Sequence, residues 1–234
     1  MRERAPAKLT LSLRVTGVRD DGYHLLDAEM VSLELADELV FADGDGLDVV
    51  GPFGDLGDLR DDDNLVRRAL RAVGRRAHVT LTKNIPAGAG LGGGSADAAA
   101  VLRWAGCDDL GVAASLGADV AFCVAGGRAR VTGIGDALAP LPVVERTFTL
   151  LTPPFGVSTV AVYRQWDAMG GPAGDGPNDL EPAALVVEPR LASWRDRLAE
   201  ATGRVPMLAG SGSTWFVEGA FPGEQRVVTR TSRP

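Results

Sequence analysis

The residue types best suited to chemistry gather in a glycine-rich segment at residues 88–95. Five glycines stand among the seven residues from Gly88 to Gly94, and Ser95 and an alanine-rich stretch follow them. Glycines allow successive backbone N–H groups to curl around an anion, and a helix start adds partial positive charge. The pattern predicts a polyphosphate-binding loop followed by a helix at about 96–105. In this prediction Ser95 is the N-cap of the helix, and its hydroxyl can also face a phosphate or Mg²⁺.

Two other interpretations of this segment stay open. Residues 88–93 fit the pattern G-x-G-x-x-G, which alone is a weak sign of dinucleotide binding. That pattern should follow directly on a strand, whereas residues 83–86 separate the preceding strand from the loop. A flexible linker is the second alternative, although linkers rarely end in a capping serine and a strong helix. The segment is not a Walker A loop, because no Gly-Lys-Ser or Gly-Lys-Thr closes it.

Lysine is rare in this chain, which draws attention to the positions that keep it. Lys8 and Lys83 are the two lysines among 24 basic residues, and arginine supplies the rest. A compact ammonium and a planar guanidinium are not interchangeable at a tight site. Lys8 lies among apolar neighbours in a predicted strand, where a lysine without a role is disfavoured. Lys83 directly precedes the glycine-rich segment, so it either reaches a phosphate or is a solvated lysine at a strand end.

The strands and helices that must position these residues do not follow a strict β-α-β alternation. Residues 9–15 alternate between apolar and polar side chains, which is typical of a half-buried strand. Further strands are expected at 28–41, 78–82, 127–132 and 147–152, before the turn at 210–213, and at 215–217 and 226–231. Helices are expected at 65–73 (with Asn64 as its N-cap), 110–116, 179–187 and 190–202, and loops at 43–63 and 168–178. This mixture indicates the α+β class.

Composition narrows the class of protein further. The 234 residues are 45% hydrophobic, which suffices for a sizeable core, and a net charge of -7 argues against a nucleic-acid or anionic-membrane binder. No transmembrane run or signal peptide is visible, and two cysteines provide neither a disulfide framework nor metal-ligand spacing. The acidic run from Asp58 to Asp63 is interpreted as a solvated loop rather than a cation site. We expect a cytoplasmic protein without nucleic-acid or membrane partners.

Three segments resemble the three motifs of the GHMP small-molecule kinases. They are Pro6–Leu11, the glycine-rich segment, and Leu208–Ser213. Further segments resemble one branch of that family, whose members act on a cytidyl substrate: Gly17 with Asp20–His24, Asp63–Leu65, Leu116–Val120, Val157–Thr159 with Val162 and Tyr163, and Asn178–Glu181. The resemblance covers about residues 5–218.

This resemblance implies a two-lobed α+β fold in which ATP and substrate meet in the cleft between the lobes. Residues 1–150 then form an ATP-binding lobe and residues 151–234 a shortened substrate lobe. The implied reaction transfers the γ-phosphoryl group of ATP, with Mg²⁺, to the 2-hydroxyl of 4-diphosphocytidyl-2-C-methyl-D-erythritol, in non-mevalonate isoprenoid precursor biosynthesis.

The resemblance also assigns roles to single residues. Asp119 matches a catalytic aspartate and Lys8 the lysine beside it; a carboxylate can take the proton of an alcohol, and a nearby ammonium keeps it ionised. The phosphate-binding residues are Gly88, Gly90, Leu91, Gly92, Gly93, Gly94 and Ser95. The position of Ser95 at the helix start, argued above, also makes it the expected Mg²⁺ ligand. The substrate-binding residues are Tyr23, His24, Asn64, Tyr163 and Asp179.

Simpler roles remain possible for several of these residues. Asp119 can be a turn residue, Tyr23 a packed turn aromatic, and Asn64 and Asp179 helix caps. The chain is also shorter than usual for this branch: it is abbreviated between Ser95 and Asp119, and residues 219–225 leave no room for the helix that the family carries there. We expect a monomer, or a homodimer that covers the face left by that helix. Two other functions stay open: a GHMP kinase for a mevalonate-like or homoserine-like alcohol, and an inactive nucleotide-binding paralogue.

Overall fold

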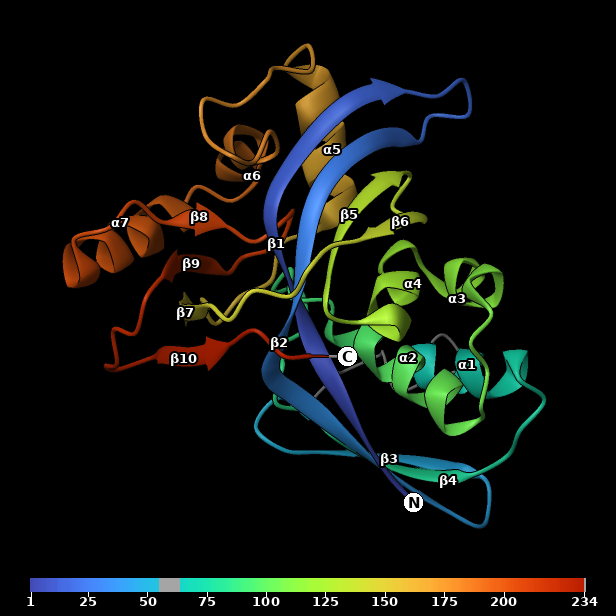
Figure 1. The fold of residues 1–234 in the computed structure, drawn as a ribbon. Helices are drawn as coiled ribbons and strands as arrows, with labels where there is room; N and C mark the ends of the chain where they lie inside the picture. The colour runs from blue at the N-terminus through green and yellow to red at the C-terminus, as the bar shows by residue number, and fades with distance from the viewer. Residues whose placement is uncertain (55–63, 234) are drawn as a thin grey trace.

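A long β-hairpin organises the first half of the chain (Figure 1). The computed structural model, which describes residues 1–54 and 64–233, pairs β1 (Arg2–Val18) with β2 (His24–Ala42) in antiparallel fashion. Strand β2 also pairs with β4 (His78–Thr82) and β5 (Arg128–Gly133), and β3 (Gly46–Val50) and β6 (Ala137–Pro140) extend the sheet on either side. We call the part built on this sheet the first lobe.

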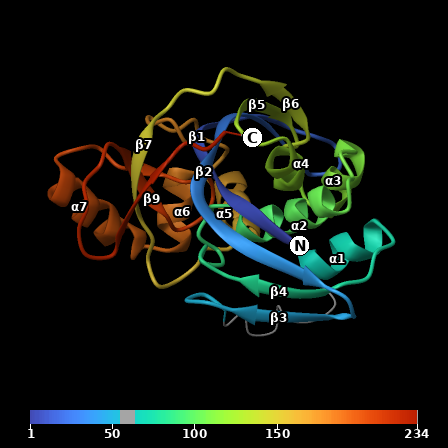
Figure 2. The same cartoon turned by 60° about the horizontal axis from the view of Figure 1, so that its bottom comes forward.

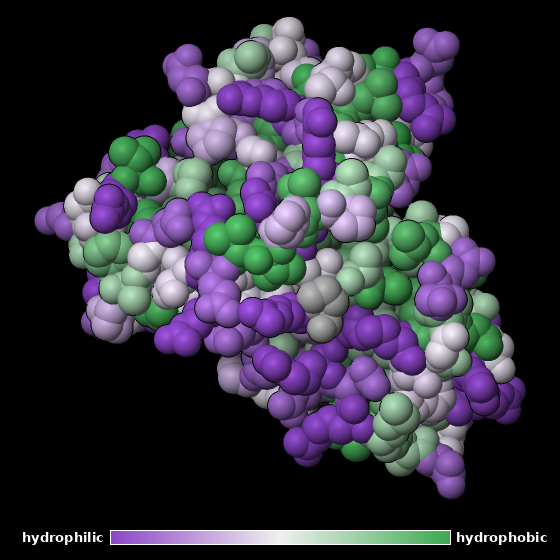
Figure 3. Space-filling model, viewed as in Figure 1, coloured by the Kyte–Doolittle hydropathy of each residue, from purple (hydrophilic) through white to green (hydrophobic). Residues whose placement is uncertain are grey.

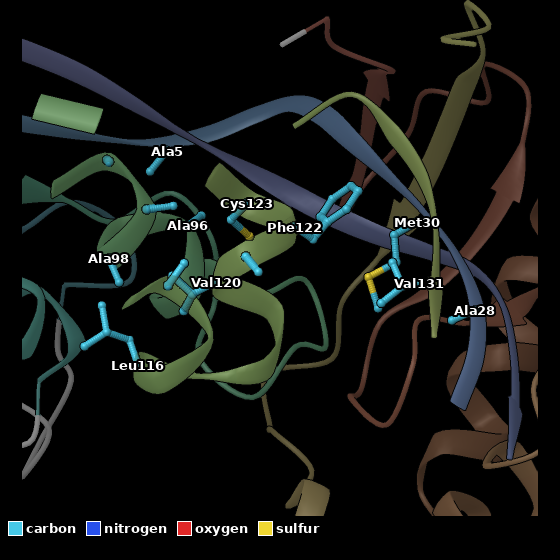
Figure 4. Close-up of a cluster of buried hydrophobic side chains, with 14 of the residues drawn as sticks. Ala5, Ala28, Met30, Ala96, Ala98, Leu116, Val120, Phe122, Cys123 and Val131 are labelled. Atoms are coloured by element: carbon cyan, nitrogen blue, oxygen red, sulfur yellow. The ribbon is translucent and has the colours of Figure 1, made fainter. Parts of the chain in front are cut away.

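Four helices cover one face of the first sheet (Figure 2). They are α1 (Leu65–Ala72), α2 (Gly93–Trp104), α3 (Leu110–Leu116) and α4 (Ala118–Ala125). Helix α2 is rich in alanine and is fully buried over Ala98–Leu102. Small side chains let it approach its neighbours closely, and Val120, Phe122 and Cys123 of α4 join the same core (Figure 4). This packing fixes the first turn of α4, which carries Asp119.

The second lobe has its own antiparallel sheet, in the order β10-β7-β9-β8. Its strands are β7 (Thr147–Leu151), β8 (Met207–Leu208), β9 (Trp215–Glu218) and β10 (Arg226–Arg230), and its helices are α5 (Thr159–Ala168), α6 (Glu181–Val187) and α7 (Leu191–Thr202). Leu9 and Leu33 of the first sheet share one apolar cluster with Phe148, Leu150 and Phe216 of the second. The lobes are therefore joined by a common core. The expected lobe boundary at residue 150 falls inside β7.

Several predicted elements are confirmed, and the α+β class is correct. The strand at 78–82 and the helix at 110–116 have the expected bounds, and no helix lies between β9 and β10 in residues 219–225. Helix α2 begins at Gly93 with Gly92 before it, so the prediction of Ser95 as N-cap is wrong. A glycine at positive φ ends the loop there, and Ser95 lies inside the first turn.

Four elements of the fold were not predicted from the sequence. Strand β3 lies in the segment 43–63 that was expected as loop, because backbone pairing with β4 outweighs its glycine and aspartate content. Strand β6 is a short edge strand that pairs with β5. Helix α4 is buried at four consecutive positions, Val120–Cys123, so its sequence does not alternate between an apolar and a polar face. Helix α5, which starts after the capping residue Ser158, was not predicted.

Polar side chains predominate on the face shown in Figure 3, with apolar ones scattered between them. Within the described ranges, no helix is both long and apolar enough to cross a bilayer. The acidic run from Asp58 to Asp63 lies outside the described residues.

Candidate functional site

A cleft of about 820 Å³ lies where the first lobe meets α5 and the turn at residues 210–211. Its walls contain all but one of the site residues expected from the sequence. Lys8, Tyr23, His24, Asn64, Gly88, Gly90–Ser95, Asp119 and Tyr163 line it. Asp179 does not line it. The fold therefore gathers residues from distant parts of the chain around one space large enough for two ligands.

The glycine-rich segment is packed directly on the third motif, backbone against backbone. Gly90 has φ +80°, and a Cβ there would lie 2.2 Å from the carbonyl oxygen of Ala209. A Cβ on Gly212 would lie 2.1 Å from the backbone nitrogen of Gly90. The N–H of Thr214 donates to the carbonyl of Ala89 at 3.1 Å. The two motifs thus form one rigid unit that a side chain at either glycine would break.

The start of α2 opens into this cleft. The N–H of Ala96 donates to the carbonyl of Gly92, so the N–H groups of Gly93, Gly94 and Ser95 precede the first intrahelical bond. Unpaired N–H groups at a helix start attract anions. Ser95 lines the cleft from the first helical turn, so its hydroxyl remains available to a ligand although it is not the cap.

An ion pair joins the first motif to α4. The Nζ of Lys8 lies 3.3 Å from Oδ2 of Asp119 and donates a hydrogen bond to Oγ1 of Thr10 at 3.1 Å. The Lys8 side chain is 8% exposed, whereas that of Asp119 is 32% exposed. The backbone N–H of Lys8 donates to the carbonyl of Leu91 in the glycine-rich segment at 3.0 Å. A fixed cation and an accessible carboxylate therefore stand beside the anion-binding loop.

Aromatic side chains line another part of the cleft. The rings of His24 and Tyr163 have centroids 4.6 Å apart, and Nε2 of His24 lies 2.8 Å from Oδ1 of Asp167. Trp166 packs edge-on against the same imidazole, with centroids 5.5 Å apart. Burial, together with the charge of Asp119, raises the pKa of the Tyr163 hydroxyl, which stays protonated at neutral pH. Tyr23 is 59% exposed at the rim. This wall offers rings for stacking and polar edges for hydrogen bonds.

Lys83 is a buried lysine that lines the cleft, rather than a solvated lysine at a strand end. Its Nζ bonds Asp37 on β2 and lies 2.8 Å from Oδ2 of Asp97 on α2, and all three side chains are buried. Asp37 also accepts the backbone N–H of Asn84 and Ile85. Burial raises the pKa of the Asp97 carboxyl to about 7 in spite of Lys83. The three residues tie the approach to the glycine-rich segment to the first turn of α2.

Two expected substrate residues have structural partners. The side chain of Asn64 accepts the N–H of Val66 at 2.9 Å, which confirms its role as the N-cap of α1, and it also lines the cleft. Asp179 is 3% exposed and accepts bonds from Arg14 (2.6 Å), the N–H of Val15 (2.9 Å) and the N–H of Gly174 (2.9 Å). The structure therefore places Asp179 at the seam between β1 and the loop before α6, away from the cleft.

Sequence reasoning missed Asp37, Asp97, Trp166 and Asp167. Asp97 lies in the helix that was predicted after the glycines, so its place on the buried face of that helix was predictable in principle. Trp166 and Asp167 follow Tyr163 by three and four residues, and they share its face only once α5 is known to be a helix.

Comparisons with known proteins identify the family of this chain. Residues 64–127 match the model of the family described as GHMP kinases N terminal domain. A 4-diphosphocytidyl-2-C-methyl-D-erythritol kinase of Paracoccus denitrificans is 43% identical over 92% of this chain and 85% of that protein. The corresponding protein of Ruegeria pomeroyi is 38% identical over 94% of this chain and 88% of that protein.

Solved structures give the same result. A crystal structure of a 4-(cytidine 5'-diphospho)-2C-methyl-D-erythritol kinase has a TM-score of 0.77 and 32% identity, with full coverage of both chains. The mevalonate kinase of Methanococcus jannaschii shares the fold, with a TM-score of 0.60, 11% identity, and coverage of 100% of this chain and 98% of that one. Identity and coverage at these levels confirm the expected kinship: the chain belongs to the 4-diphosphocytidyl-2-C-methyl-D-erythritol kinase family of the GHMP kinases.

Proposed function

We propose that this protein transfers the γ-phosphoryl group of ATP to the 2-hydroxyl of 4-diphosphocytidyl-2-C-methyl-D-erythritol, a step of isoprenoid precursor synthesis. The observation that carries the proposal is the Lys8–Asp119 pair, 3.3 Å apart, in the same cleft as the glycine-rich loop and the His24–Tyr163 wall. Family membership supports the substrate, and the cleft supports the chemistry.

Asp119 is proposed to accept the proton of the attacking hydroxyl. As the new O–P bond forms, the bond from the γ-phosphorus to the β,γ-bridging oxygen breaks, ADP leaves, and the proton passes to the carboxylate. The ammonium of Lys8, 3.3 Å from this carboxylate, is proposed to orient the hydroxyl. A positioned base of this kind accelerates reactions by about 10²–10⁴-fold.

The phosphates of ATP are proposed to lie on the loop from Gly88 to Ser95. Its backbone N–H groups at the start of α2 point into the cleft, where charge develops on the transferring group. These donors are fixed by the contact with the third motif before any ligand binds, so no reorganisation is needed during the reaction.

The cytosine ring is proposed to lie against Tyr23, His24 and Tyr163. A base offers a face for stacking and an edge for hydrogen bonds, and an aromatic wall with an imidazole suits both. Asn64, at the start of α1, lies in the same cleft and is proposed to contact the substrate.

Magnesium is proposed to arrive with the nucleotide. Within the described residues, no cluster of three His, Cys, Asp or Glu side chains offers a resident metal site. Mg²⁺ commonly keeps waters and binds substrate phosphates with one or two protein ligands, which fits the Ser95 hydroxyl at the loop. The ion would neutralise phosphate charge. We further propose a cytoplasmic protein that acts as a monomer or homodimer.

The test is ADP release from Mg-ATP by the purified protein with four additions: the cytidyl substrate, mevalonate, homoserine, or no acceptor. Turnover with the cytidyl substrate alone is expected. Turnover with mevalonate or homoserine would instead assign another alcohol to the cleft. ATP binding without turnover on any acceptor would indicate an inactive paralogue.

A further inference from the structure

His24 is held by three residues from one face of α5. Tyr163, Trp166 and Asp167 stand at positions i, i+3 and i+4 of the helix, which share a face. The two aromatic rings pack on the imidazole from different directions, at interplanar angles of 38° and 80°. The carboxylate of Asp167 lies 2.8 Å from Nε2. The ring plane and one of its two nitrogens are therefore fixed by the protein before any substrate binds.

The contact with Asp167 decides which nitrogen carries the proton. An ionised carboxylate only accepts hydrogen bonds, so Nε2 of His24 must be the donor. In a neutral imidazole the other nitrogen then has a lone pair and is an acceptor. Within residues 1–54 and 64–233, no protein group hydrogen-bonds to Nδ1 of His24. His24 lines the cleft, and its side chain is 12% exposed.

An acceptor at this position discriminates between the two pyrimidines of nucleotide metabolism. Cytosine carries an amino group at C4, which donates hydrogen bonds, whereas uracil carries an oxygen there, which accepts them. The lone pair of Nδ1 attracts the amino group of cytosine and repels the oxygen of uracil. With the opposite tautomer, Nδ1 would donate, and the preference would be reversed.

We infer that Asp167 is a positioning residue that fixes His24 as the Nε2–H tautomer and thereby selects a cytidine over a uridine substrate. The inference rests on the proposed function, because it takes the nucleobase to lie against His24. Asp167 acts through the imidazole and need not touch the base.

The test variant is Asp167→Asn, which is nearly isosteric. An amide can turn either its oxygen or its NH₂ group toward Nε2, so it tolerates both tautomers and enforces neither. Asp167 has a half-exposed side chain in the last turn of α5, so the exchange spares the core. We expect the ratio of kcat/KM for the cytidyl substrate to that for its uridyl analogue to fall on the order of tenfold, with KM for ATP unchanged.

The chain offers a matched control. Nε2 of His78 lies 2.8 Å from Oδ2 of Asp48, the same contact on an exposed edge of the first sheet outside the cleft. Asp48→Asn should leave the cytidine-to-uridine ratio unchanged. An equal fall of the ratio in both variants, or no fall in Asp167→Asn, would overturn the inference.

Two further measurements separate this role from other roles for Asp167. The chain has two histidines, so two-bond ¹H–¹⁵N spectra of His78→Gln report on His24 alone. At about pH 8.5, where an ordinary histidine is neutral, the spectra of His78→Gln should show the Nε2–H tautomer of His24. The spectra of the double variant His78→Gln/Asp167→Asn should show a mixture of the two tautomers. A Nδ1–H tautomer in the His78→Gln protein would refute the inference, even if the Asp167 variant fails to fold.

A double mutant then tests whether Asp167 acts through His24. In a His24→Asn background, Asp167→Asn should change the cytidine-to-uridine ratio no further. A full additional loss would mean that the carboxylate contacts the base itself. If the wild type phosphorylates neither nucleotide, the proposed function fails; if it prefers cytidine and Asp167→Asn keeps that preference, the inference alone fails.

Discussion

The stem of Lys8 runs directly beneath Gly92, and its Nζ reaches 3.3 Å from the carboxylate of Asp119. A Cβ on Gly92 would lie 2.7 Å from Cγ of Lys8. The lysine of the first motif, the loop of the second and the carboxylate on α4 are thus packed as one unit. The position of the Lys8 ammonium depends on its packing against Gly92, and its charge acts on Asp119. Substitutions at Asp119 and Gly92 test these two contributions one at a time.

Asp119→Asn should abolish most turnover while it preserves the fold. The amide keeps the shape of the side chain but cannot take a proton from the substrate hydroxyl. We expect kcat to fall by about 10²–10⁴-fold, with ATP affinity changed little. ADP release and ATP titration calorimetry measure the two quantities.

The control for this variant is Asp48→Asn, on an exposed edge outside the cleft. Its kcat should equal that of the wild type. Undiminished turnover in Asp119→Asn would remove Asp119 from the role of base, and loss of ATP binding together with turnover would point to a damaged cleft.

Gly92→Ala should impair the loop far more than Gly94→Ala. Gly92 has φ +67°, which disfavours alanine, and its new methyl group would collide with the Lys8 stem. Gly94 has no positive φ, and a Cβ there meets Leu65 Cδ1 at 3.4 Å. We expect Gly92→Ala to raise KM for ATP and lower kcat, each by about tenfold or more.

Steady-state kinetics of the two variants, with thermal melts beside them, check this contrast. Equal kinetics in both variants would contradict the packing of loop and lysine described above.

Much of this site could be predicted because its motifs are local. The five glycines, Lys8 and Asp119 each stand in a short pattern with a chemical reason for its residue types, and the structure brings them to one cleft. The long strand β1 was found from its alternation, although only its central part alternates cleanly. Local patterns and the tertiary structure agree there.

The features of the site that could not be predicted depend on contacts between distant segments of the chain. The burial of Lys83 could not be predicted, because nothing in the sequence identifies its two partners. Asp37 is far from Lys83 in the sequence, and Asp97 lies within a predicted helix where nothing marks it as a partner. The structural partners of Asp179 were hidden because Arg14, which pairs with it, is 165 residues away in the sequence. No helix was predicted over α5, so the shared face of Tyr163 and Asp167 was hidden.

Asp179→Ala should cost stability rather than substrate affinity. The exchange removes the acceptor of three donors, and it leaves the N–H groups of Val15 and Gly174 without their carboxylate. We expect the free energy of unfolding to fall by about 2–4 kcal/mol. Below the melting temperature, KM for the cytidyl substrate should stay within about twofold of the wild-type value, since Asp179 does not line the cleft.

Urea unfolding and initial rates decide between the two roles. A large rise in KM with unchanged stability would place Asp179 at the substrate after all.

Asp97→Asn should change how stability depends on pH. Burial raises the pKa of Asp97 to about 7 from an ordinary value of 3.8, even with Lys83 beside it. Between these values the native state holds a proton that the unfolded state has released, so the wild-type free energy of unfolding falls as pH rises from about 4 to 7. Asparagine resembles the neutral carboxyl at every pH, and it removes this contribution.

The free energy of unfolding of Asp97→Asn, relative to that of the wild type, should therefore increase between pH 5 and pH 8. A pKa shift of this size corresponds to an increase on the order of a few kcal/mol. Urea unfolding at the two pH values measures it. Asp27→Asn is a control of opposite sign, because a hydrogen bond from Arg130 lowers the pKa of Asp27, and its effect should change only as pH falls below about 4. If the Asp97→Asn difference is the same at pH 5 and pH 8, then Asp97 is ionised throughout, and Lys83 alone compensates for its burial.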